Sequence, residues 1–199
     1  MKNFSITPIE IIKSFTKNRS LIYQMSKREV VGRYKGSLMG LLWSFFNPAL
    51  MLVIYTFVFS IIFKARWPGV TNNLEFAGIL FAGLIIYSLF SECISRSPSL
   101  ILSNVNYVKK VIFPLEILSW IALGSSLFHA SVSVIVLLGF MLFLTGGLHW
   151  TVVLFPLVIF PLLLLTMGIS WILASLGTYS RDIGQVISFI VMAMMFMRP

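Results

Sequence analysis

The longest uncharged stretch of the chain runs from Ile117 to Ser180, 64 consecutive residues without Asp, Glu, Lys or Arg. A membrane-spanning helix needs only about 20 apolar residues, so this stretch is long enough to cross a bilayer twice. Hydrophobic residues make up 58% of the chain and charged residues only 11%, which leaves too few polar side chains to cover a soluble globule. We therefore predict an all-α membrane protein, a polytopic helical bundle.

Five apolar segments can be delimited. The turn-like residues Thr145 to Trp150 divide the long stretch into spans at 117–144 and 150–178, and Pro156 and Pro161 are expected to bend the second of these. Two earlier spans are predicted at 38–63 and 74–94.

The fifth segment, 183–199, is too short to cross a hydrocarbon core of about 30 Å, and it ends on Arg198 and Pro199. We expect it to be the incomplete fifth span of a longer protein. The alternative is a short re-entrant end buried in an oligomer.

The basic residues indicate the orientation of the chain. Twelve Lys and Arg lie before the first span or in the loops after the second and fourth spans, whereas only Lys64 and Arg66 lie on the opposite side. Because basic residues accumulate in cytoplasmic loops, this distribution predicts a cytoplasmic N-terminal segment at 1–36 and a transmembrane domain at 37–199. The distribution of basic residues therefore explains the net charge of +9 as a signal of membrane topology, and we predict no nucleic-acid partner.

The cytoplasmic N-terminal segment is predicted to form an amphipathic interface helix. Leu21, Ile22 and Met25 share one helical face, which is suited to lie on membrane lipid. In a sharper interpretation, the same helix contacts a cytoplasmic partner through a second set of residues. This set is Glu29, Arg33, Tyr34 and Lys35.

The segment 95–116 is patterned like a second contact region. Pro98 is suited to open a short helix after Ser97, and apolar residues such as Leu100 give that helix a hydrophobic face. Such a helix could transmit motion from a soluble partner, or it could simply cap the bundle. The residues expected to take part are Ser97, Asn104, Asn106, Lys109 and Lys110.

In a third loop, Arg181 is expected to anchor the topology and Asp182 to cap the next helix, so a structural role explains both.

Residues that could carry catalysis are scarce. His129 and His149 have no carboxylate or cysteine at ligand spacing, Cys93 is the single cysteine, and no phosphate-binding G-x-x-x-x-G-K-[ST] loop is present. We therefore predict no catalytic residue, no metal site and no ATP hydrolysis by this chain.

Aromatic residues of the first two spans could line a path for sugar rings. These are Trp43, Phe46, Tyr87 and Phe90.

Three motifs occur in a particular order: "RYKGSLMGLLWSFFNPALMLVIYTFVFSIIF", "NVNYVKKVIFPLEIL" and "YSRDIGQ". In this order the chain resembles the membrane subunits of ATP-binding cassette exporters of cell-surface polysaccharide, which carry O-antigen, capsular polysaccharide or teichoic acid. The resemblance covers nearly the whole chain from about residue 20. In this family a basic interface helix turns sharply into the first span, so Gly32 to Gly40 resembles that turn, where Gly36 and Gly40 are expected to permit close helix approach.

The resemblance also implies partners and a location. It implies a permease that lies in the bacterial cytoplasmic (inner) membrane, forms a homodimer and exports a lipid-linked polysaccharide. ATP and Mg would be bound by a separate ATPase subunit, which segment 95–110 would contact as a coupling helix. The family has six spans, one more than are visible here. The alternatives are an exporter of another amphiphile such as a lipid or drug, a membrane-embedded glycan or lipid transferase, and a scaffold that transports nothing.

Overall fold

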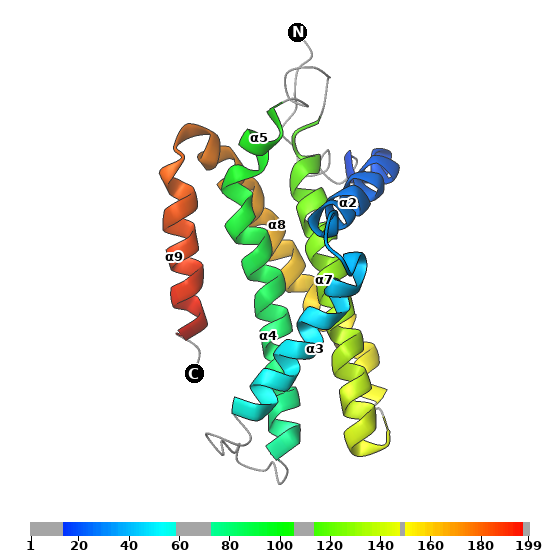
Figure 1. The fold of residues 1–199 in the computed structure, drawn as a ribbon. Helices are drawn as coiled ribbons and strands as arrows, with labels where there is room; N and C mark the ends of the chain where they lie inside the picture. Colours follow the sequence, from blue (N-terminus) through cyan, green and yellow to red (C-terminus); the bar gives the residue numbers. More distant parts are fainter. Residues whose placement is uncertain (1–13, 59–72, 106–113, 148–149, 197–199) are drawn as a thin grey trace. The chain divides into compact units, whose positions relative to one another are not determined.

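The computed structural model describes residues 14–58, 73–105, 114–147 and 150–196, which are helical and contain no strand (Figure 1). This confirms the predicted all-α class. The α-helices are α2 (Arg19–Tyr34), α3 (Trp43–Tyr55), α4 (Asn73–Arg96), α5 (Leu100–Ser103), α7 (Ile117–Thr145), α8 (Phe155–Tyr179) and α9 (Asp182–Phe196). Three short 3-10 helices accompany them: η1 (Gly40–Leu42), η3 (Ser97–Ser99) and η4 (Trp150–Leu154).

Four helical stretches of the described chain are long and apolar enough to cross a membrane. They are Gly40–Val58, Phe76–Ser103, Ile117–Leu144 and Val152–Tyr179. They overlap the four long spans predicted from the sequence, and the fifth predicted segment corresponds to the shorter apolar helix Asp182–Met195.

The second of these stretches extends further than predicted. It does not end near Ile94 but continues from α4 through η3 into α5. Pro98 lies in the first turn of η3, where its missing N–H changes the helix type without ending the helix.

The chain divides into two compact units. The first contains Met1–Val30, Ser91–Ser126 and Leu163–Pro199, and the second contains Val31–Phe90 and Leu127–Leu162. In the first unit, α2 packs against the beginning of α7, and α8 and α9 form a helical hairpin (Figure 1). In the second unit, η1 and α3 follow the turn after α2.

The turn between α2 and α3 depends on two glycines with left-handed backbones. Gly36 has φ 92° and Gly40 has φ 51°, a region in which other residues are strained. A Cβ atom built on either glycine would meet no other described residue within 4 Å. Within the described residues these glycines serve the backbone conformation of the turn, and the expectation that they permit close helix approach stays a prediction.

The two prolines of the fourth span have different positions in α8. Pro156 is the second residue of the helix, because the preceding residues form the 3-10 helix η4. Proline is tolerated in a first helical turn, where its missing N–H would have no intrahelical partner. Only Pro161 lies inside the helix, so the predicted bend could arise from that residue alone.

Candidate functional site

The first unit has a hydrophobic cluster that joins α2, α5 and the first turns of α7. Ile22 of α2, Leu100 of α5 and Leu118 of α7 are all buried in it. Burying one such side chain stabilises a protein by about 1.5–3 kcal/mol, so the short helix α5 is held firmly despite its four residues. Leu21, on a different part of α2, is 37% exposed. The cluster therefore fixes the predicted interface helix to the predicted coupling segment.

Next to this cluster, an ion-pair network connects α2 to the end of α4. The Nη2 atom of Arg96 donates a hydrogen bond to the Glu29 carboxylate, and its Nη1 atom lies 3.6 Å from the Glu92 carboxylate, one helical turn earlier. The side chains of Arg96 and Glu29 are only 31% and 26% exposed. A partly buried pair is screened less by solvent and salt than a surface pair, so this network stabilises the contact between α2 and α4.

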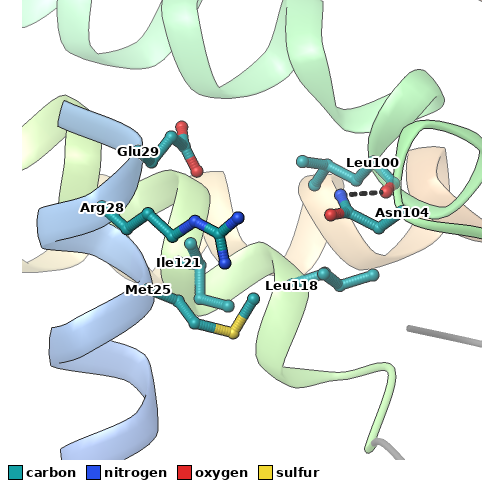
Figure 2. Close-up of a pocket in the computed structure, with 7 residues that line it drawn as sticks. All are labelled: Met25, Arg28, Glu29, Leu100, Asn104, Leu118 and Ile121. Atoms are coloured by element: carbon teal, nitrogen blue, oxygen red, sulfur yellow. Dashed lines mark hydrogen bonds between the residues drawn. The ribbon is translucent and has the colours of Figure 1, made fainter. Parts of the chain in front are cut away.

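A pocket of about 240 Å³ lies beside the network. Figure 2 shows the Arg28 side chain extending from α2 into this pocket, across from Asn104. The Asn104 side chain is oriented by a 2.8 Å hydrogen bond from its Nδ2 atom to the Leu100 carbonyl. The residues that line the pocket are Met25, Arg28, Glu29, Leu100, Asn104, Leu118 and Ile121.

The 3-10 helix η3 is held on its other side by α8. The Ser97 hydroxyl lies 2.6 Å from the Cys93 carbonyl and 2.8 Å from the Ser170 hydroxyl of α8. At Gly177 the two backbones come so close that an added Cβ atom would overlap the carbonyl group of Pro98. The segment from η3 to α5 is thus in direct contact with α2, α7 and α8, and any displacement of it must be shared with them.

The structure separates the predicted coupling residues into different environments. Glu29 pairs with Arg96, Asn104 lines the pocket, and Arg33 and Lys35 are exposed. Ser97 has no exposed surface, so its side chain supports the segment from inside and is not available to a partner. Asn106, Lys109 and Lys110 lie outside the described residues.

Tyr34, another predicted contact residue, packs within the second unit. Its hydroxyl oxygen lies 3.4 Å from Nδ1 of His129, and the two rings meet edge to face with centroids 5.9 Å apart. His129 thus packs against a tyrosine. Among the described residues, no group of three or more His, Cys, Asp or Glu side chains could hold a metal ion.

The aromatic residues proposed for a sugar path all belong to the second unit. Trp43 and Phe46 are three residues apart on α3, and Tyr87 and Phe90 are three residues apart on α4, so each pair shares a helix face. Phe46 is 39% exposed, whereas the other three are half-buried.

In the predicted third loop, Arg181 and Asp182 are exposed, and Asp182 is the first residue of α9. A carboxylate at this position interacts favourably with the positive end of the helix dipole. This placement is compatible with the structural role expected from the sequence.

The residues that join the elements are hard to find from sequence patterns. Arg96 is one of the twelve basic residues that indicate the orientation, and its spacing of four from Glu92 is the one sequence signal of an ion pair. Nothing in the sequence pairs Ser97 with Ser170, or Pro98 with Gly177, because these contacts depend on how the helices pack.

The fold is that of a multi-pass helical membrane protein, and its residues 20–199 match the family model of the ABC-2 type transporters. The chain therefore belongs to the ABC-2 type transporter family.

Its curated relatives include the O-antigen export system permease protein RfbA of Myxococcus xanthus, which is 27% identical over 96% of this chain and 71% of the relative. Two proteins of the same name from Klebsiella pneumoniae are 29% and 27% identical, each over 90% of this chain and 67% of the relative. These relatives are named as transport permeases, in agreement with a membrane subunit that is not itself an enzyme.

Proposed function

We propose that this chain is the permease subunit of an ATP-driven exporter that moves lipid-linked cell-surface polysaccharide across the bacterial cytoplasmic membrane. Membership of the ABC-2 type transporter family and the names of the relatives support this function. The O-antigen of those names is one such polysaccharide.

The observation that carries the proposal is the segment formed by η3 and α5. This segment continues directly from the spanning helix α4 and is packed against α2, α7 and α8. A soluble ATPase that pushed on this segment would therefore move several helices together, which is what conversion of ATP hydrolysis into transport requires. ATP and Mg are bound by that ATPase subunit, and this chain supplies the membrane path.

The remaining parts of the proposal concern assembly and orientation. The N-terminus is cytoplasmic, as the excess of Lys and Arg on that side favours. Two copies of the chain enclose the path, and the aromatic residues Trp43, Phe46, Tyr87 and Phe90 stack on the sugar rings that pass. Replacement of Trp43 and Tyr87 by Ala is then expected to lower the export rate.

The test uses the full-length protein produced together with candidate ATPase subunits encoded beside its gene. Complex formation, ATP turnover and surface polysaccharide are measured for the wild type and for a double charge reversal, K109E with K110E. The matched control is K17E with R19E, because both of those side chains are exposed and the charge change is equal. We expect the first variant to lose the coupling between ATP turnover and export, and the control to keep it.

Two results would count against the proposal. If the wild type binds no ATPase subunit, the chain is not the permease of such an exporter. If the ATPase binds but surface polysaccharide does not depend on the complex, the exporter carries another substrate.

A further inference from the structure

Two adjacent serines of α7 have hydroxyl groups without a hydrogen-bond partner in the described part of the chain. Ser125 and Ser126 are 0% and 1% exposed, and neither side-chain oxygen makes a hydrogen bond there. Further along the same helix, Ser131 and Ser133 donate to the carbonyl oxygen four residues earlier, at 2.7 Å and 3.0 Å. A serine inside a helix can satisfy its hydroxyl in this way. Ser125 and Ser126 instead point away from their own backbone toward other surroundings.

The Arg96 guanidinium group also has one donor that is not satisfied. Its Nη2 atom bonds to the Glu29 carboxylate, but its Nη1 atom is buried and makes no hydrogen bond to any described residue. The Glu92 carboxylate lies 3.6 Å from Nη1, beyond the range of about 2.7–3.2 Å for a direct N–H···O hydrogen bond. An ordered water molecule can bond to both groups at this separation. A carboxylate has about four acceptor positions, so Glu92 can accept from water in addition to its other contacts.

Cys93 brings these groups together around one position between α4 and α7. Its thiol lies next to the Ser126 hydroxyl, and the charges of Glu92 and Arg96 act on it. Residues 92, 93 and 96 lie on one face of α4, because about 3.6 residues make one helical turn. All of these residues belong to the first unit. Polar groups from two helices thus surround a region in which Cys93 and Ser126 are almost completely buried.

Water is the ligand that this set of groups fits. Glu92 and Arg96 lie in the apolar stretch Phe76–Ser103, and ionisable residues in such stretches pair with one another or face water. A buried water typically makes about three hydrogen bonds to groups that otherwise lack a partner. Here Arg96 Nη1 is a donor, Glu92 is an acceptor and the Ser126 hydroxyl can be either. An anion is disfavoured, because two carboxylates accompany one guanidinium group.

We infer that Arg96, Glu92 and Ser126 hold an ordered water molecule that joins the ion-pair network to α7. Arg96 Nη1 donates to the water, the water donates to the Glu92 carboxylate, and the Ser126 hydroxyl takes a remaining position. Because Nη2 is bonded to Glu29, Arg96 then links α2, α4 and α7. The water site depends neither on the cargo nor on the ATPase subunit, so its test can fail without the proposed function failing.

The experiment uses Cys93 as a reporter of water. The full-length protein in nanodiscs receives an X-ray pulse, which makes hydroxyl radicals from bound as well as bulk water, and mass spectrometry measures the oxidised side chains. Met167 of α8 is the internal control, because it is 3% exposed, Cys93 is 2% exposed, and both sulfur atoms are readily oxidised. We expect Cys93 of the wild type to be oxidised several-fold faster than Met167. Equal protection of the two residues would refute a water molecule beside Cys93.

Two substitutions test which groups hold the water. S126V removes the hydroxyl and fills its space, and R96K keeps the charge but loses the second guanidinium nitrogen. We expect each of them to reduce the oxidation of Cys93 several-fold. The matched controls are S133V, at a hydroxyl bonded to its own backbone, and R181K, at an exposed position, and neither should change the oxidation of Cys93. Oxidation of Cys93 that does not respond to S126V or R96K would refute these residues as the water ligands.

The melting temperature in nanodiscs gives a second measurement, in which the sign of the change decides. If Ser126 bonds to water, S126A loses that bond, and the melting temperature falls by about 2–4 °C. If the site is dry, alanine removes a buried hydroxyl without a partner, and the melting temperature stays equal or rises, which would refute the water site. A variant that unfolds is recognised by oxidation of Met167. The comparison of Cys93 with Met167 in the wild type then decides alone.

Discussion

The close approach of Gly177 to Pro98 allows a sharp test of how η3 is held. In G177A the new Cβ atom would lie 2.6 Å from both the Cα atom and the carbonyl carbon of Pro98. The preferred separation of two carbon atoms is about 3.5–4.0 Å, so α8 and η3 must move apart by about 1 Å. Both contacts are with backbone atoms, which cannot rotate away as the end of a side chain can.

The expected effect follows from two opposing contributions. Overpacking of this kind costs about 1–3 kcal/mol. Replacing Gly by Ala inside a helix stabilises the helix by about 1 kcal/mol. Gly168 on the same helix is the matched control, because an added Cβ there meets no other described residue within 4 Å. G168A should therefore be neutral or slightly stabilising, and G177A should be less stable than G168A by about 1–3 kcal/mol.

The assay is the apparent melting temperature in detergent, followed by tryptophan fluorescence. For a protein of this size 1 kcal/mol corresponds to about 2–4 °C, so the two variants should differ on the order of 5 °C. ATP turnover in the complex should also become less dependent on export in G177A, because η3 is displaced. If the two variants have equal melting temperatures and equal coupling, the contact between η3 and α8 does not restrain the segment.

Three further results are expected. E29Q should lower the free energy of unfolding by about 1–2 kcal/mol, which lies between the losses measured for exposed and for buried ion pairs. The charge exchange E29R with R96E should recover part of this loss. Both variants are measured by chemical denaturation. S97A should lower the free energy of unfolding by about 1 kcal/mol. A double-mutant cycle with S170A should give a coupling energy of at least about 0.5 kcal/mol between the two hydroxyl groups. If the effects of the two substitutions are strictly additive, the hydrogen bond between Ser97 and Ser170 is contradicted. Cys93, which is 2% exposed, should react with a maleimide only after denaturation, and rapid labelling of the native protein would disprove its burial.

The spans could be predicted because they depend on local composition alone. A stretch such as Ile117 to Ser180 has no charge that water must solvate, so its placement in lipid requires no knowledge of its neighbours. The position of Pro98 in a short helix could also be predicted, because proline removes a donor at its own position.

The candidate site could be predicted only in part. The sequence pointed to Glu29 and Asn104 as surface contacts, but their roles as an ion-pair partner and a pocket residue depend on α2 packing against α5 and α7. Ser97 illustrates the limit most clearly. A serine beside a proline in a loop-like sequence suggests exposure, yet the packing of η3 against α8 buries Ser97 completely.

The 3-10 geometry of η3 also determines the direction in which α5 faces. A 3-10 helix advances by about 120° per residue and an α-helix by about 100°, so three residues of η3 rotate everything after them by about 60° relative to a continuous α-helix. After η3, Leu100 is buried in the cluster with Ile22 of α2 and Leu118 of α7, and Asn104 lines the pocket. The angular position of α5 about its own axis is therefore set by the helix type of Ser97–Ser99, and a substitution there can redirect the following residues without changing any of them.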